Sequence, residues 1–125
     1  MNTKLTDLIK KDEEIKGELL AEALFPYMNF TESGELLPSE SFKKLSSKAK
    51  VLVVLLSGVA LLQLGIRQTD RMAPKDVVEM SAIPAGTVRP ALKELLEEKV
   101  VAIRNGEYQI PPRSFSDVKR LIEEG

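Results

Sequence analysis

The chain has 125 residues, of which 43% are hydrophobic and 30% are charged. This length and composition predict one globular domain with a core of its own, not a disordered chain or two domains. Cysteine and histidine are both absent from the sequence, which excludes disulfides, thiolate metal sites and histidine acid–base chemistry. Eighteen Lys and Arg against nineteen Asp and Glu leave a net charge of −1. Any affinity for nucleic acid must therefore come from how the charges are distributed over the surface.

Residues 1–45 are expected to form a helix and a connector that pack on the rest of the chain. The pattern predicts a helix from Thr3 to Leu24, ended by Pro26. Its apolar residues recur near one face at helical spacing: Leu5, Leu8, Ile15 and Leu19. The connector over residues 27–38 is expected to hold one short β pairing, between residues 27–30 and 35–37.

The stretch from Val51 to Ile66 is the most apolar in the sequence, and Ser46 or Ser47 can cap a helix that contains it. Its sixteen residues, at about 1.5 Å each, span roughly 24 Å, short of the roughly 30 Å hydrocarbon core of a bilayer. We therefore expect a buried central helix. Part of it could also form a dimer core, and four residues fit either role: Val53, Val54, Leu61 and Leu64.

Two short helices joined by a turn are predicted next. Pro74 suits the first turn of the first helix, and Asp76 lies favourably at its positive end. The buried side of that helix would be Val77, Val78 and Met80. After a break over residues 81–86, with Ile83 beneath the turn, the second helix would direct Val88, Leu92 and Leu95 inward. We expect Gly86 or Thr87 to cap this helix, which places Pro90 in its first turn.

A β-hairpin is predicted around Asn105-Gly106, which favours a type I′ turn. The expected cross-strand pairs are Arg104 with Glu107, Ile103 with Tyr108, Ala102 with Gln109, and Val101 with Ile110. One face of the hairpin would then be apolar and pack on the core. After Pro111-Pro112, the segment Ser114–Asp117 predicts a capped last helix. The apolar stripe of that helix would be Phe115, Val118, Leu121 and Ile122.

The order of these elements, from Ser47 to Ile110, resembles the winged helix-turn-helix superfamily of archaeal and bacterial transcription regulators. The resemblance lies in the apolar first helix, the segment IPAGTVRPALKELLEEKVV at residues 83–101, and a short wing ending in Tyr108-Gln109-Ile110-Pro111. It implies a mainly α fold with a small β-hairpin wing (α+β). Residues 46–125 would form the winged helix-turn-helix domain with a C-terminal helix, and residues 1–45 would add an N-terminal helix to the same compact domain. It also implies a homodimer that binds operator DNA. The second helix of the motif would be the recognition helix in the major groove.

Five candidate DNA-binding residues follow from this interpretation: Lys75, Thr87, Arg89, Lys93 and Arg104. Arg89 and Lys93 are suitable ligands for bases or phosphates, and Thr87 could contact a phosphate or a thymine methyl group. Lys75 and Arg104 would contact backbone phosphates. Three carboxylates in the second half of the same helix would repel DNA if they faced it: Glu94, Glu97 and Glu98. Residues 67–110 hold seven cations and seven anions.

Two functions from different classes therefore remain open. The first is a DNA-binding transcription regulator that acts as a homodimer. The second is a winged-helix module that binds another protein within a larger complex, without binding DNA, which the short wing and the acidic helix also suit. We expect a cytoplasmic protein that does not associate with a membrane and binds no cofactor or metal. No glycine-rich phosphate loop, metal-ligand cluster or nucleophile motif occurs in the sequence, so we do not expect an enzyme.

Overall fold

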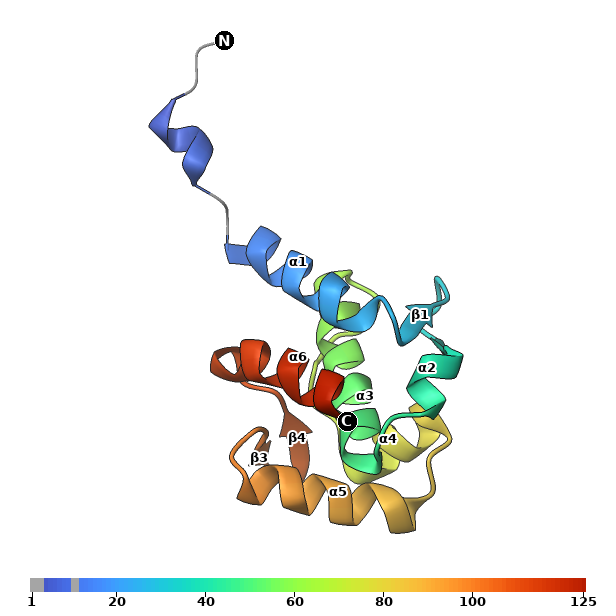
Figure 1. The fold of residues 1–125 in the computed structure, drawn as a ribbon. Coiled ribbons are helices and arrows are strands. Elements are labelled where there is room, and N and C mark those ends of the chain that lie inside the picture. Colours follow the sequence, from blue (N-terminus) through green and yellow to red (C-terminus); the bar gives the residue numbers. More distant parts are fainter. Residues whose placement is uncertain (1–3, 10–11) are drawn as a thin grey trace.

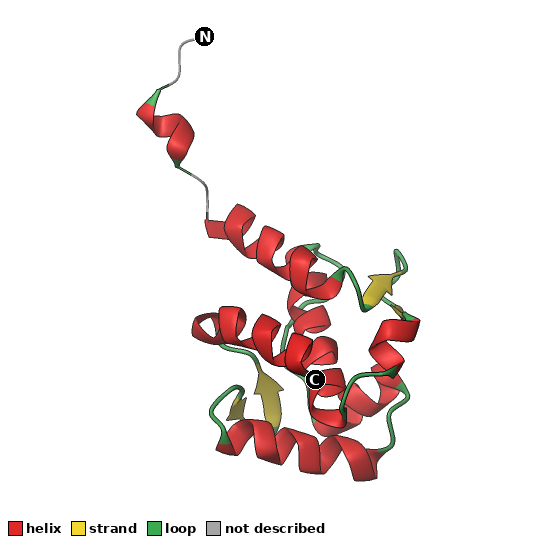
Figure 2. Cartoon of the chain, in the orientation of Figure 1, coloured by secondary structure: helices red, strands yellow, loops and turns green. Residues whose placement is uncertain are grey.

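Helices make up most of the chain in the computed structural model, which describes residues 4–9 and 12–125 (Figures 1 and 2). The helical elements are η1 (Leu5–Leu8), α1 (Asp12–Leu24), α2 (Glu40–Lys43), α3 (Ser47–Gln63), α4 (Pro74–Ser81), α5 (Ala85–Glu97), η2 (Pro112–Ser114) and α6 (Phe115–Glu124). The strands are β1 (Met28–Phe30), β2 (Leu36–Pro38), β3 (Ala102–Arg104) and β4 (Glu107–Gln109). β1 pairs with β2 and β3 with β4, both antiparallel. This confirms the expected class, mainly α with a small β-hairpin.

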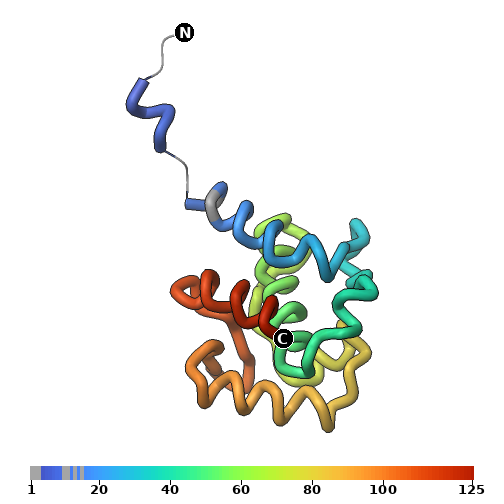
Figure 3. The backbone as a smooth tube through the Cα atoms, in the orientation of Figure 1, coloured from blue at the N-terminus to red at the C-terminus, as the bar shows by residue number. Residues whose placement is uncertain are grey.

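Helix α3 is the centre of the fold, and α1, α4, α5 and α6 all pack against it (Figure 3). Ser46 caps it, since its hydroxyl accepts the N–H of Ala49 at 3.2 Å. Residues 51–61 are all buried, as expected for a central helix. Val53, Val54 and Leu61 therefore belong to the core of one chain, whereas Leu64 is 64% exposed. No helix among the described residues is both long and apolar enough to cross a bilayer.

A glycine in the middle of α3 lets the segment before α4 lie close to the helix. A Cβ atom at Gly58 would lie only 2.6 Å from the terminal methyl carbon of Met72. Met72 is fully buried and exchanges two backbone hydrogen bonds with Tyr108 of β4, at 2.9 and 2.7 Å. The close approach at Gly58 therefore helps to position both the start of α4 and the hairpin.

The prediction of one continuous helix from Thr3 to Leu24 is wrong at its N-terminal end. Leu5–Leu8 forms a separate 3₁₀ turn, and Ile9 after it has an extended backbone (φ −89°, ψ 122°). Thr3 and residues 10–11 lie outside the described residues, as does the side chain of Ile15. Leu5 and Leu8 are exposed because the core contacts of α1 begin further along the helix. These contacts use Leu20, Ala23 and Leu24, and Leu19 stays at the surface.

The connector after α1 contains the expected pairing. Met28, Asn29 and Phe30 pair with Pro38, Leu37 and Leu36 respectively. Ser39 then caps the short helix α2, since its hydroxyl accepts the N–H of Phe42 at 3.3 Å.

Helix α4 begins as predicted, and α5 begins earlier than predicted. Pro74 is the first residue of α4, and the Asp76 carboxylate accepts the N–H of Ala73 at 2.8 Å. The cap expected at Gly86 or Thr87 is wrong, because the Pro84 carbonyl already accepts the N–H of Thr87 at 2.9 Å. Pro84 is the cap, and the helix starts at Ala85. Pro90 consequently lies inside the helix, where it gives the Gly86 carbonyl no hydrogen bond. Both residues are exposed to solvent, so water can bond that carbonyl.

The hairpin has the predicted type I′ turn, with positive φ at Asn105 (52°) and Gly106 (77°). Three of the four expected pairs form, while Val101 and Ile110 lie beyond the observed strands. The expectation of one fully packed apolar face is wrong at the tip. Ile103 is 44% exposed because the tip of the hairpin extends past the core. Val101 and Ile110, at the base of the hairpin, are buried against the core.

The last helix packs back on the domain through buried Val118 and Ile122. Its predicted side-chain cap is wrong. Ser114 stands at the cap position, but its backbone is already helical (φ −93°, ψ −7°) because it ends η2. Within the described residues its hydroxyl makes no cap hydrogen bond.

Candidate nucleic-acid interface

Helix α5 carries its exposed charges on two separate flanks. Val88, Leu92 and Leu95 are fully buried, as predicted, and define its inward face. At about 100° per residue, Arg89 and Lys93 lie together on one flank of that face. Glu94 and Glu98 lie together on the other flank, and Glu97 lies between the two flanks on the outermost side. All five charged residues are exposed. The helix is therefore basic along one flank and acidic along the other.

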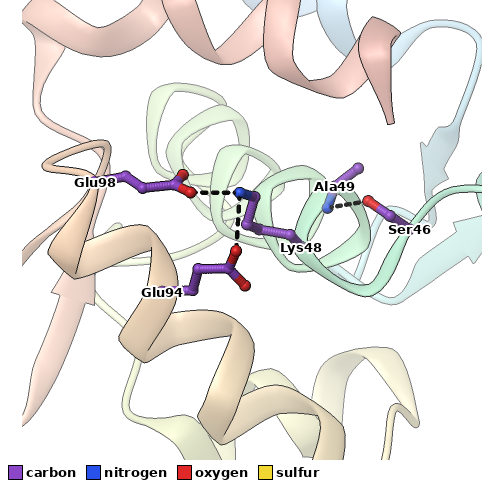
Figure 4. Close-up of polar contacts among 5 residues, drawn as sticks. All are labelled: Ser46, Lys48, Ala49, Glu94 and Glu98. Atoms are coloured by element: carbon purple, nitrogen blue, oxygen red, sulfur yellow. Dashed lines mark hydrogen bonds and ion pairs between the residues drawn. The ribbon is translucent and has the colours of Figure 1, made fainter.

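The acidic flank is held against α3 by one lysine (Figure 4). The ammonium group of Lys48, in the first turn of α3, donates to Glu98 at 2.6 Å and to Glu94 at 3.4 Å. The hydrogen bond to Glu98 is the largest of the effects that raise the pKa of Lys48 above its ordinary value, and Glu94 acts in the same direction. Two of the three carboxylates that would repel DNA are thus paired with a cation on a neighbouring helix.

The basic flank borders a hollow between α4 and α5. The hollow has a volume of about 180 Å³ and is lined by Pro74, Lys75, Val78, Glu79, Ala85 and Arg89. The structure thus brings together two predicted site residues from different helices, Lys75 and Arg89. Glu79 was not predicted to lie here, although its position four residues after Lys75 places both on one face of α4. Its carboxylate lowers the positive charge of the hollow.

Two cations of the neighbouring segment serve the fold. Arg67 donates to the carbonyl oxygens of Thr69 and Arg71, each at 2.9 Å. Arg71 donates to the side chain of Gln109 in β4 at 2.7 Å and so ties the segment before α4 to the hairpin. Their guanidinium groups are committed to these internal contacts. The exposed cations of α4 and α5 are therefore Lys75, Arg89 and Lys93.

No family model, curated protein or solved structure matches this chain. Within residues 4–9 and 12–125, no group of three or more acidic side chains could hold a metal ion.

Thr87 and Arg104 lie apart from the other three predicted site residues. Thr87 is half-buried and stands two residues before Arg89, which places it on the flank of Glu94 and Glu98. Arg104 is exposed in β3, at the hairpin turn, and the hairpin lies beside the C-terminal end of α5 (Figure 1). The hollow with Lys75 and Arg89 is at the opposite end of α5. The candidate residues thus extend along the whole helix, which is about 20 Å long.

Proposed function

We propose that this chain is a winged helix-turn-helix protein that binds double-stranded DNA as a homodimer and regulates transcription. The order α3–α4–α5–β3–β4 supports the fold, with α5 as the recognition helix and the hairpin as the wing. In this proposal the basic flank of α5 enters the major groove and carries Arg89 and Lys93 to bases and phosphates.

The observation that carries the proposal is the separation of charge on α5. A neutral domain binds DNA only if its cations face the duplex and its anions do not. Arg89 and Lys93 form one exposed flank, whereas Glu94 and Glu98 are paired with Lys48 on the other. DNA that approaches along the basic flank would meet the cations without the two paired carboxylates.

The ends of α5 supply the phosphate contacts in this proposal. Lys75 and Arg89 both line the hollow near the N-terminus of α5, so both cations could contact one stretch of DNA backbone. No acidic residue lies in the first turn of α5, which leaves its positive end available for a phosphate. Thr87 would contact the DNA strand on the opposite side of the major groove. Arg104 would contact a phosphate further along the duplex, from the wing.

A double substitution tests the proposal. We expect Arg89→Ala with Lys93→Ala to weaken binding to a mixed-sequence duplex at least about tenfold, since both lost cations contact the DNA. The measurement is fluorescence anisotropy at about 50 mM salt, where electrostatic binding is strong. Lys43→Ala with Arg120→Ala is the matched control, because it removes two exposed cations from α2 and α6.

The control should retain affinity within about threefold, and circular dichroism should show that both variants keep the fold. An unchanged affinity in the Arg89 and Lys93 variant would contradict the proposed contacts. An equal loss of DNA affinity in both variants would contradict the proposed contacts as well, since the net charge of the protein alone would then explain the binding.

A further inference from the structure

An apolar groove lies on the side of the fold built by α1, β1 and the C-terminal end of α3. It has a volume of about 280 Å³ and is lined mainly by apolar side chains, among them Leu20, Leu24, Phe25, Met28, Phe30 and Leu64. Phe25 is 83% exposed and Leu64 is 64% exposed. Large apolar side chains exposed together around a groove are typical of a surface that binds another apolar surface.

The same chain exposes a second apolar surface, on residues 4–9, which we call the arm. Leu5 is 84% exposed, and Leu8 and Ile9 are each 74% exposed. Figures 1 and 3 show the arm extending beyond the N-terminal end of α1, away from β1 and the rest of the fold. The arm thus offers three large apolar side chains that its own core does not cover.

We propose that the arm of one copy docks into the groove of a second copy, and that the two copies exchange arms reciprocally. This inference rests on the homodimer of the proposed function and names the contact that makes it. In a dimer with twofold symmetry, each arm would occupy the groove of the other copy, so that no arm or groove is left uncovered. A closed symmetric dimer requires this reciprocity. Burial of Leu5, Leu8 and Ile9 against the groove would remove apolar surface of both copies from water.

The charges beside the two surfaces are complementary. Residues 4–11 contain three lysines and one aspartate, whereas residues 12–24, which span α1, contain five carboxylates and one lysine. Glu14 and Glu18 lie beside the groove-lining Gly17 and Ala21 on α1, at helical spacing. The arm itself is neutral, with one lysine and one aspartate, and the excess of lysine comes from Lys10 and Lys11, which follow it in the sequence. The basic segment of residues 4–11 would therefore meet an acidic helix along the edge of the groove, which favours this occupant over an acidic one.

A second copy fits the groove better than the arm's own chain. The arm extends beyond the N-terminal end of α1 (Figure 1), whereas the groove is lined by the C-terminal half of that helix, from Gly17 to Leu24. To enter its own groove the arm would have to lie back along α1. A partner's arm does not have to lie back along its own α1, and exchange of identical elements is a common route to dimers.

Self-association of the full chain without DNA tests the inference. Sedimentation equilibrium from about 1 to about 100 µM should show a dimer. Leu5→Ser with Leu8→Ser and Ile9→Ser removes the arm contacts, and Phe25→Ser with Leu64→Ser removes the groove contacts. Each variant should raise the dimer dissociation constant at least about 100-fold. Leu37→Ser, which replaces a 49% exposed leucine outside both surfaces, should leave it unchanged.

Mixing the two variants distinguishes exchange from any other dimer. The arm variant keeps an intact groove and the groove variant keeps an intact arm, so energy transfer between labelled copies should reveal a mixed dimer, weaker than the wild type. Wild-type protein that is monomeric throughout, as when each arm binds its own groove, would overturn the inference. Dimers that survive both sets of substitutions, or a mixture without energy transfer, would overturn it too. Duplex binding measured on the same samples shows separately whether the proposed DNA function holds.

Discussion

The ammonium nitrogen of Lys48 lies 2.6 Å from a carboxylate oxygen of Glu98, a residue fifty positions further along the chain. This contact joins the first turn of α3 to the C-terminal end of α5. With the weaker bond to Glu94, it pairs both carboxylates that helical spacing places on one flank of α5. The proposed DNA-binding surface depends on this separation of charges.

Replacement of Lys48 should weaken DNA binding although the residue makes no proposed contact with DNA. In Lys48→Ala, Glu94 and Glu98 lose their partner and repel the phosphates, so we expect about a threefold to tenfold loss of affinity at low salt. The measurement is duplex anisotropy. Adding Glu94→Gln and Glu98→Gln to Lys48→Ala should restore the affinity. If the triple variant still binds DNA as weakly as Lys48→Ala alone, Lys48 contacts the DNA itself and our interpretation is wrong.

The stability that Lys48 contributes should persist through neutral pH and disappear at alkaline pH. Because Glu98 and Glu94 raise its pKa in the folded state, the folded protein holds the proton more tightly than the unfolded chain. The contribution is complete below the ordinary lysine pKa of about 10.4 and is lost as pH rises through the folded-state pKa. Chemical denaturation of wild type and Lys48→Ala should differ by at most about 1 kcal/mol, because the pair is partly exposed. A difference that grows above about pH 10.4 would contradict this sign.

Removal of the carboxylate from the hollow should strengthen DNA binding. Glu79 lines the hollow with Lys75 and Arg89, so Glu79→Gln leaves the two cations uncompensated there. We expect about a twofold to fivefold gain in affinity at low salt, and a smaller gain at high salt. Glu123→Gln is the matched control, since it removes one exposed carboxylate from α6. Weaker binding by Glu79→Gln, or an equal gain in the control, would argue against phosphate contacts at the hollow.

Replacement of Pro90 should stabilise the protein. Pro90→Ala supplies the N–H that the Gly86 carbonyl lacks, which should raise the free energy of unfolding by about 1–2 kcal/mol. The gain is smaller than the full helix penalty of proline because proline also restricts the unfolded chain. Thermal and urea denaturation measure it. Pro112→Ala at the start of η2 is the control, since an N–H there has no partner to gain. A lower free energy of unfolding in Pro90→Ala would contradict this prediction and show that the proline stabilises the helix at this position.

Elements with strong local signals could be predicted from the sequence. The apolar run around Val54 predicted the buried helix, and Ser46-Ser47 predicted a cap at its start, which Ser46 forms. Asn105-Gly106 predicted the turn and the register of three pairs. In each case the interactions that decide the structure lie within a few residues of one another, so the local pattern contains the necessary information.

Features decided by distant residues could not be predicted. The contact of Lys48 with Glu98 joins two helices that the sequence does not place relative to each other. The break between Leu8 and α1 depends on where the core stops, since the leucine spacing continues through it. The early start of α5 depends on the Pro84 carbonyl, which begins the helical hydrogen bonds before Gly86. The hollow that unites Lys75, Glu79 and Arg89 likewise exists only once α4 and α5 pack.

The most direct measurement is a titration of a mixed-sequence DNA duplex with the protein at about 50 and about 200 mM salt, followed by fluorescence anisotropy. If α5 and its neighbours neutralise about four phosphates, the affinity should fall about 100-fold between the two conditions. Absence of binding at about 50 mM salt, where even non-specific attraction is measurable, would contradict the DNA-binding proposal. The mainly helical fold would be unaffected by that result, and a protein-binding module would become the favoured function.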